Sequence, residues 1–291
     1  MTTATAARSG KGHRDENFPV ASWLLDRRYR GPILAFYRFA RAADDVADHP
    51  TLLPEEKLAL LDRLGEALSG KGPADPEAEP LRAALGDYRL APRHAYDLLD
   101  AFRLDVRKLR YASWDDLMDY CRLSAMPVGR FVLDVHKEDR ATWQAADPLC
   151  AALQVINHLQ DCARDYRQLD RVYLPLDVLA SHGARPEMLA ERQSRPALLG
   201  AIRELAGQTS ALLRQSASLS RQVRDVRLSL EIAAIQMLAE HLVRRLATRD
   251  PLSERVHLGK FGFAALGGCG VARGFAAIIA RSFVTGRNLP R

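Results

Sequence analysis

The chain has 291 residues, of which 47% are hydrophobic and 27% are charged, and its formal net charge at pH 7 is +6. A chain of this size and composition can bury one large core or two modest ones, and no shift in composition demands two domains. The four cysteines show no Cys-x-x-Cys spacing, which favours free thiols in a reducing cytoplasm over a disulfide framework or a zinc site.

Residues 1–16 are small and polar and hold no apolar run, so we expect a disordered lead and not a signal peptide. Beyond them, nearly every long segment has the apolar period of a helix and almost none alternates as a strand does. We therefore expect one all-α domain over residues 17–285, followed by a short tail at 286–291. The expected helices are residues 18–29, 32–49, 54–69, 77–87, 92–109, 113–137, 142–169, 195–220, 224–249 and 257–283.

The helix expected at residues 32–49 carries one polar stripe, formed by Tyr37, Arg41, Asp44 and Asp48 at steps of four, three and four residues. Side chains at this spacing leave one face of a helix, one turn above another. The residues before the stripe are mostly apolar, so we expect it to lie near the core. A solvated acidic face, with Arg41 in an ion pair within the helix, is the alternative for this segment taken alone.

The helix expected at residues 113–137 contains an unusual stretch, Ser124-Ala125-Met126-Pro127-Val128-Gly129. Small residues and a proline inside an apolar helix cost stability and normally kink it. The stretch either lets a bulky ligand approach the backbone or marks a helix boundary inside the segment.

The helix expected at residues 142–169 carries a second polar stripe, formed by Gln154, Asn157, Asp161 and Asp165. Two further polar residues follow where the chain leaves this helix, Arg171 and Tyr173. They either reach back to the stripe or cap and pack the turn.

Two acidic helix faces in a basic chain have one physical explanation in common. Like charges on apolar helices repel one another and resist desolvation unless a positive charge joins them. Mg²⁺ prefers oxygen ligands and commonly lies between protein carboxylates and the phosphates of a substrate. If the two helices face each other, the aspartate pairs predict a clamp that holds a diphosphate through magnesium ions.

The end of the chain is strongly biased in charge, because six basic residues and no acidic residue follow Glu254. Basic and apolar residues together predict a helix that either contacts an anionic membrane surface or packs on the bundle. Arg273 in its middle and several glycines make it a poor membrane-spanning segment. No nucleic acid is expected as a partner, because the basic residues form no recognisable binding motif.

These motifs, in this order, resemble the squalene/phytoene synthase family of head-to-head trans-isoprenyl synthases. The resemblance runs from about residue 17 to residue 175, and it implies an isoprenoid-synthase helical bundle with a central active-site cavity. The residues that carry it are Asn17-Phe18-Pro19-Val20, then Tyr37, Arg41, Asp44 and Asp48, then Tyr120, Cys121, Val128 and Gly129, then Gln154, Asn157, Asp161 and Asp165, and last Arg171 and Tyr173.

Within the family, residues 16–22, 124–129 and 160–166 resemble the bacterial hydroxysqualene synthases of hopanoid pathways. The resemblance implies ionisation of presqualene diphosphate with Mg²⁺, rearrangement of the carbocation, and capture by water to give hydroxysqualene and diphosphate. No NADPH is expected, which agrees with the lack of a Gly-rich dinucleotide fingerprint. The chain departs from the family's common second motif at Gln160, where the family has Arg, and at Arg164, where the family has Glu, so this site is less acidic.

The resemblance also implies a role for each matched residue. The implied metal ligands are Asp44, Asp48, Asn157, Asp161 and Asp165. The implied catalytic residues are Tyr37, Tyr173 and the four aspartates, and the implied substrate-binding residues are Phe18, Arg41, Ser124, Val128, Gln154, Asn157, Gln160 and Arg171. Phe18, Phe36 and Tyr37 are expected to line an apolar pocket for the carbocation.

Two other functions stay open at this point. A presqualene diphosphate, squalene or phytoene synthase would condense two prenyl diphosphates on the same fold. A non-catalytic relative would use the bundle as an assembly scaffold, but such a protein is expected to lose the acidic motifs, and this chain retains both. The expected location is the cytoplasm, with or without peripheral contact to the inner face of the membrane.

Overall fold

The computed structural model describes residues 24–285. Within that range the chain is all α-helical, apart from two short 3₁₀ turns and one isolated bridge between Arg110 and Val172, as predicted. The helices are α1 (Arg27–Ala47), α2 (Pro54–Ser69), α3 (Ala78–Tyr88), α4 (Arg93–Arg107), α5 (Trp114–Ser124), α6 (Met126–Val135), α7 (Trp143–Leu169), α8 (Leu176–Ser181), α9 (Pro196–Ser216), α10 (Leu219–Gln222), α11 (Val226–Thr248) and α12 (Lys260–Thr285), with 3₁₀ turns at Arg140–Thr142 and Pro186–Ala190.

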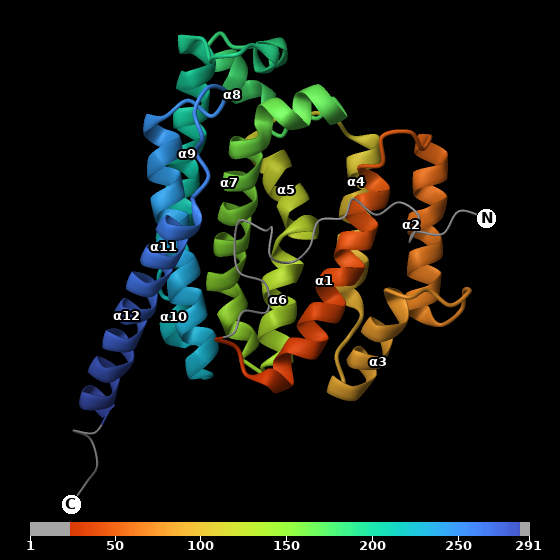
Figure 1. Cartoon of the computed structure of the whole chain (residues 1–291), viewed down its shortest axis with the longest axis vertical. Helices are drawn as coiled ribbons and strands as arrows, with labels where there is room; N and C mark the ends of the chain where they lie inside the picture. Colours follow the sequence, from red (N-terminus) through yellow and green to blue (C-terminus); the bar gives the residue numbers. More distant parts are fainter. Residues whose placement is uncertain (1–23, 286–291) are drawn as a thin grey trace, which may run out of the picture.

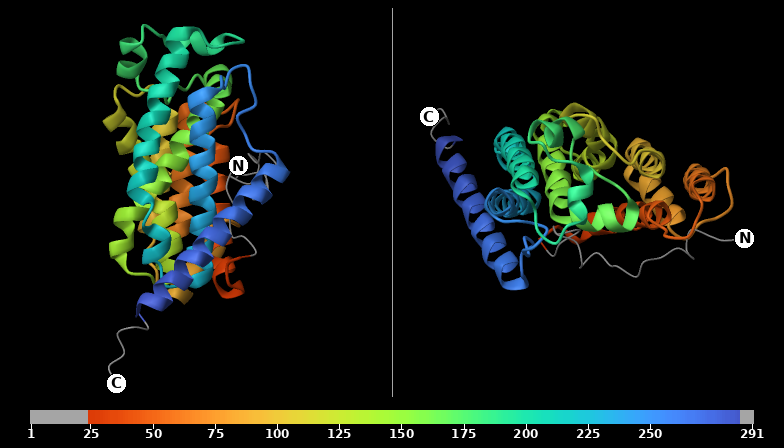
Figure 2. Two further views of the ribbon diagram at one scale, coloured as in Figure 1. Left: turned by 90° about the vertical axis from the view of Figure 1, so that its left-hand side faces the viewer. Right: turned by 90° about the horizontal axis from the view of Figure 1, so that it is seen from above.

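The long helices form a bundle along the long axis of the molecule (Figure 1). Helix α7 lies in its centre and packs against α5 and α6 on one side and against α9 and α11 on the other. Helix α1 packs against α2, α3, α4 and α6. Helix α12 crosses the outer side of α11 (Figure 2). No helix among residues 24–285 combines the length and the apolar character that crossing a bilayer requires.

The expected break between residues 29 and 32 is wrong, because α1 runs through Pro32 without interruption. The side chain of Asp26 caps the helix by accepting a hydrogen bond from the Arg28 amide at 3.1 Å. Pro32 has no N–H to donate to the carbonyl of Arg28, and the Tyr88 hydroxyl donates to that carbonyl instead. A contact from a distant helix thus offsets the cost of the proline. The first part of the expected 18–29 helix, with Phe18, lies outside the described residues.

The single helix expected at residues 113–137 is also wrong, because the structure divides it into α5 and α6. The break falls at Ala125, whose backbone angles of φ −118° and ψ −48° leave the regular helix. Pro127 stands in the first turn of α6, where a missing N–H costs little. The helix boundary is therefore the correct one of the two interpretations for this stretch.

The other expected helices agree with the structure to within a few residues at each end. The sequence pattern missed α8, α10 and both 3₁₀ turns, which are too short to show an apolar period. The packing of α12 is visible at Gly270, where an added Cβ would lie 2.6 Å from the Cα of Ala234. Only a residue without a side chain lets the two helix backbones approach so closely, and this part of α12 packs on the bundle.

Candidate active site

Two cavities lie end to end inside the bundle, and the first is polar. Its volume is about 280 Å³. It contains both aspartate pairs together with residues from α4, α5 and the segment after α7. The lining residues are Arg41, Asp44, Asp48, Phe102, Asp105, Tyr120, Ser124, Gln154, Asn157, His158, Asp161, Arg164, Asp165, Leu169, Arg171 and Tyr173.

The second cavity is apolar and also has a volume of about 280 Å³. Helices α1, α6, α7 and α11 form most of its wall. The wall includes Phe36, whose ring stacks on that of Phe131 with ring centroids 4.0 Å apart. The lining residues are Leu25, Ile33, Phe36, Tyr37, Ala40, Val128, Gly129, Val132, Leu133, Ala146, Leu149, Cys150, Leu153, Asn157, Leu219, Leu228, Glu231, Ile232 and Ile235.

The change from apolar to polar occurs at the same level on two facing helices. On α1, the residues that line the apolar cavity lie within 33–40, and those that line the polar cavity lie within 41–48. On α7, the apolar cavity takes residues 146–153 and the polar cavity begins at Gln154. Asn157 lines both, so the two spaces meet at its side chain. A ligand lying along α1 from residue 33 to residue 48 would span about 22 Å, at 1.5 Å per residue.

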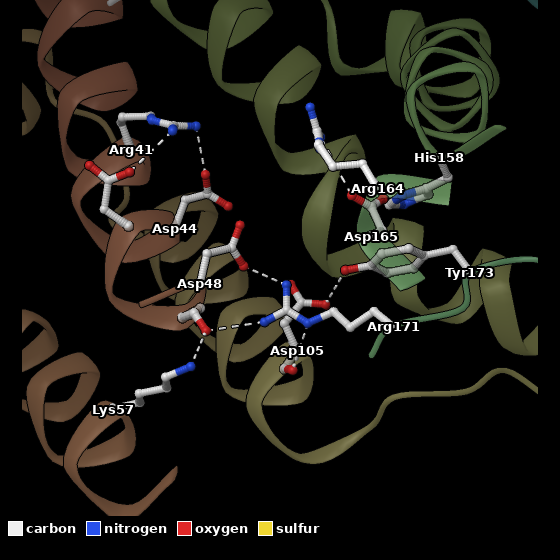
Figure 3. A network of polar contacts seen from close by, with 12 residues as sticks. Arg41, Asp44, Asp48, Lys57, Asp105, His158, Arg164, Asp165, Arg171 and Tyr173 are labelled. Carbon is white, nitrogen blue, oxygen red and sulfur yellow. Dashed lines mark hydrogen bonds and ion pairs between the residues drawn. The ribbon is translucent and has the colours of Figure 1, made fainter. Parts of the chain in front are cut away.

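The first aspartate pair is held by arginine side chains. Arg41 forms ion pairs with Asp44 at 2.7 Å and with the buried Asp45 at 3.1 Å. The ion pair within the helix is therefore present at Arg41, and Arg41 also lines the polar cavity together with Asp44 and Asp48. In Figure 3, Asp44 and Asp48 lie on one side of the site and Asp165 on the other.

Arg171 joins three segments of the chain. Its guanidinium pairs with Asp48, and it donates hydrogen bonds to the carbonyl oxygens of Ala47 and Asp105, both at 3.1 Å (Figure 3). The same Ala47 carbonyl accepts a hydrogen bond from Lys57 at 2.9 Å. Of the two interpretations for Arg171, the one in which it reaches back to the site is therefore correct. Asp170 makes this possible, because it turns the chain at the end of α7 with φ of 51°.

The second aspartate pair has its own basic partners. Arg164 contacts Asp161 at 2.8 Å and Asp165 at 3.4 Å. His257, in the loop before α12, lies 3.5 Å from Asp161. Burial raises the pKa of Asp161, but His257 and Arg164 outweigh it and the net direction is downward. The residue that replaces the family's Glu therefore serves as a counter-ion to the acidic pair.

Asp105 is a buried residue that lines the polar cavity and was not predicted from the sequence. It accepts hydrogen bonds from the hydroxyls of Tyr120 and Tyr173, both at 2.8 Å. His158 stacks on Tyr173 with ring centroids 3.6 Å apart, and burial lowers the pKa of His158 to about 3. His158 is therefore a neutral imidazole at physiological pH, and it packs the ring of Tyr173 in place.

The comparisons with known proteins agree with this geometry. A family model described as squalene/phytoene synthase matches residues 12–262. The chain belongs to the squalene/phytoene synthase family. The chain is 57% identical to the hydroxysqualene synthase of Rhodopseudomonas palustris over 263 residues, which cover 90% of each chain. It is 54% identical to that of Sinorhizobium fredii over 258 residues, covering 89% of this chain and 88% of the relative.

A solved structure of a dehydrosqualene synthase in complex with ligand has the same fold. It is 22% identical and superposes with a TM-score of 0.76 over 89% of this chain and 90% of its own. The isoprenoid-synthase-type helical bundle expected from the sequence is thereby confirmed.

The structure brings most of the residues matched to the family into one place. The polar cavity gathers Arg41, Asp44, Asp48, Ser124, Gln154, Asn157, Asp161, Asp165, Arg171 and Tyr173, and the apolar cavity gathers Phe36, Tyr37, Val128 and again Asn157. Gln160 is buried and lines neither cavity. Its place follows from helix geometry, because a residue next to Asp161 points about 100° away from it.

The donor chemistry of the polar cavity fits Mg²⁺. Its acidic groups offer oxygen atoms only, and burial raises the pKa of Asp44 well above its ordinary value, with Asp48 adding to the effect. Burial likewise raises the pKa of Asp165 to about 7, and the charges of Asp161 and Asp48 add to it. Because burial disfavours the ionised form of both carboxyl groups, a bound cation would stabilise that form.

Mg²⁺ does not require a closed cage of protein ligands. Among residues 24–285, no three acidic, histidine or cysteine side chains converge into such a cage. Mg²⁺ usually takes one or two carboxylates and completes its shell with waters and substrate phosphates, so two aspartate pairs are sufficient.

Proposed function

We propose that this enzyme is a hydroxysqualene synthase, which ionises presqualene diphosphate and captures the rearranged carbocation with water to give hydroxysqualene and diphosphate. Two relatives of that name, each more than half identical over about 90% of this chain, support the proposal. The observation that carries it is the junction of the polar and apolar cavities at Asn157. Such a site accepts a molecule with one diphosphate group and a long hydrocarbon body.

The polar cavity would hold the diphosphate. Arg41 and Arg171 line it, and a guanidinium presents paired N–H donors that match phosphate oxygens. Asp44, Asp48, Asp161, Asp165 and Asn157 would hold Mg²⁺. Bound Mg²⁺ would stabilise the negative charge that develops on the leaving diphosphate. We also propose that Tyr173 orients the leaving group, because Asp105 fixes its hydroxyl beside the two aspartate pairs.

The apolar cavity would hold the hydrocarbon chains and the carbocation. Its wall carries Phe36 and Tyr37, whose ring faces are attractive to a cation. Few polar groups line it, so a carbocation formed there meets little water before it rearranges. Val128, which is 42% exposed, lies where the apolar cavity approaches the protein surface. Gln160 lines neither cavity, so no contact between Gln160 and the substrate is expected.

The experiment that tests the proposal supplies the purified enzyme and Mg²⁺ with presqualene diphosphate, without a nicotinamide cofactor. Parallel reactions contain farnesyl or geranylgeranyl diphosphate. Hydroxysqualene from the first substrate alone is the expected result. Presqualene diphosphate, squalene or phytoene from the prenyl substrates would assign the enzyme to condensation instead. Lack of turnover with every substrate, and no effect of EDTA on ligand binding, would favour the non-catalytic scaffold.

We propose in addition that part of α12 contacts an anionic membrane surface. Phe275 is 53% exposed although it is large and apolar, and the segment after Glu254 has only basic charges. Apolar and basic side chains on one helix favour the headgroup region of anionic lipids. The product is an apolar alcohol, which dissolves in a bilayer and not in water.

Sedimentation with lipid vesicles tests this contact. Vesicles with an anionic lipid should pellet the full-length protein, and vesicles of phosphatidylcholine should pellet much less. Phe275→Ser should weaken the sedimentation, and Leu53→Ser, at an exposed leucine before α2, serves as the matched control. Equal sedimentation of Phe275→Ser and the unsubstituted protein would contradict the contact.

A further inference from the structure

One residue that lines the apolar cavity is acidic, whereas most of the wall is apolar. Glu231 of α11 is only 4% exposed and faces the cavity together with Leu228, Ile232 and Ile235. These four residues follow one another at steps of three, one and three, which is the spacing of a single helix face. The stripe is apolar at every position except that of Glu231.

Among the described residues, Glu231 carries the only carboxyl group that lines the apolar cavity, whereas the other carboxylates of the site line the polar cavity. A ligand in the apolar cavity can therefore contact one carboxyl group, which comes from α11.

If the proposed function is right, the reaction needs a base in this cavity. A carbocation captured by water needs a water molecule held next to it and a base that accepts a proton. The apolar cavity offers three other groups of polar character, which are the Tyr37 hydroxyl, the Asn157 amide and the Cys150 thiol. None is a base at neutral pH, because phenol and thiol are protonated there and an amide does not accept a proton. Burial moreover raises the pKa of Cys150 to about 12.

Position also separates Glu231 from the leaving group. Helix α11 contributes Leu228, Glu231, Ile232 and Ile235 to the apolar cavity and no residue to the polar cavity. Water held by Glu231 would therefore approach the carbocation from a wall that takes no part in binding diphosphate. Recapture by diphosphate and capture by water would occur from different sides.

We propose that Glu231 holds the water that captures the carbocation and acts as its general base, an inference that rests on the proposed function. A bond forms between the water oxygen and the cationic carbon, and one O–H bond of that water breaks. The proton passes to the Glu231 carboxylate, and the product is a neutral alcohol. Glu231 returns the proton to solvent when the product leaves. The negative charge of Glu231 also stabilises the carbocation before capture.

The test measures two products of the same reaction, diphosphate and hydroxysqualene, from presqualene diphosphate and Mg²⁺. The unsubstituted enzyme should form one hydroxysqualene for each diphosphate. Glu231→Gln keeps the shape of the side chain and removes the base. We expect it to release diphosphate still, but to form at least about tenfold less hydroxysqualene per diphosphate, with hydrocarbons that arise by loss of a proton from carbon.

A matched control lies on the same helix. Glu240→Gln makes the same chemical change at a residue that lines neither cavity, and it should keep the ratio of one. A Glu231→Gln enzyme that keeps the ratio of one would overturn the inference. So would a folded variant in which both products fall in equal proportion, because Glu231 would then support ionisation or structure.

A second variant covers the case in which Glu231→Gln does not fold. Glu231→Met has a similar length and matches the apolar stripe, and the same fall in ratio is expected from it. Failure of the proposed function looks different from failure of this inference. In the first case the unsubstituted enzyme releases no diphosphate from presqualene diphosphate, and the inference falls with it. In the second case that enzyme keeps the ratio of one and Glu231 variants keep it too.

Discussion

Replacing Arg171 with methionine is expected to lower the free energy of unfolding by about 3–5 kcal/mol, the usual cost of removing one partner from a buried ion pair. Arg171 is 6% exposed and holds the end of α1 to α4 through Asp48 and two carbonyl oxygens. Each hydrogen bond lost to a carbonyl oxygen costs about 1.5 kcal/mol or more, so the two together account for about 3 kcal/mol or more. The pair with Asp48 adds at most about 1 kcal/mol, because that side chain is 37% exposed and water replaces part of the contact.

Thermal unfolding followed by circular dichroism measures this loss. In a chain of this size, 1 kcal/mol shifts the melting temperature by about 2–4 °C, so Arg171→Met should melt about 6–20 °C lower. Arg171→Lys is the matched control, because it keeps the charge but cannot reach three acceptors at once. The melting temperature of Arg171→Lys should lie between those of the unsubstituted protein and Arg171→Met.

A second substitution makes the reasoning specific to the ion pair. Asp48→Asn in the Arg171→Met background should restore about 1 kcal/mol, since it removes a carboxylate that has lost its partner and lies near Asp44 and Asp105. A loss below about 1 kcal/mol for Arg171→Met would refute the argument. A double variant that is no more stable than Arg171→Met would refute it as well.

Three further predictions concern the site. Asp44→Asn and Asp161→Asn should each lower turnover at least about 1000-fold and leave the circular dichroism spectrum unchanged; near-normal turnover would contradict the magnesium clamp. Burial raises the pKa of Asp105 from its ordinary value of 3.8 to about 6. The contribution of Asp105 to the free energy of unfolding is therefore full below about pH 4 and is lost as the pH rises through about 6. Asp105→Asn stays neutral, and urea unfolding should show it up to about 3 kcal/mol more stable than the unsubstituted protein above pH 6 and equal to it below pH 4; a difference independent of pH would contradict this. Gly129→Ala should cost about 1–3 kcal/mol because its Cβ would lie 2.4 Å from the Cys150 sulfur, and Cys150→Ala should restore most of that loss; no rescue would show that the contact is relieved elsewhere.

The sequence alone was sufficient for the aspartate pairs, because residues four apart on a helix share a face wherever the helix lies. The same rule, applied to Gln160, would have excluded it from the cavity, since it is adjacent to Asp161 and points to another face. Its assignment came from a motif and not from geometry. The residue roles themselves stay predictions until variants are measured.

Other features depend on contacts between distant segments and left no local signal. Asp105 stands in an ordinary amphipathic helix, and only the fold shows that two tyrosine hydroxyls donate to it. Pro32 predicted a helix break because the hydroxyl of Tyr88, far along the chain, could not be foreseen. Glu231 likewise reads as a surface residue until α11 is placed against the apolar cavity.

The expected domain limits at residues 17 and 285 stay a prediction. So does the disordered lead, because the structure describes residues 24–285. The role of Phe18 in the carbocation pocket also lies outside the described residues.

The most direct test of the central claim is a reaction with presqualene diphosphate and Mg²⁺ in water enriched in ¹⁸O, with mass spectrometry of the alcohol and of the released phosphate. Ionisation with water capture predicts one ¹⁸O atom in hydroxysqualene and none in diphosphate, because the carbon–oxygen bond breaks. An unlabelled alcohol with ¹⁸O in the released phosphate would mean hydrolysis at phosphorus and would contradict the account.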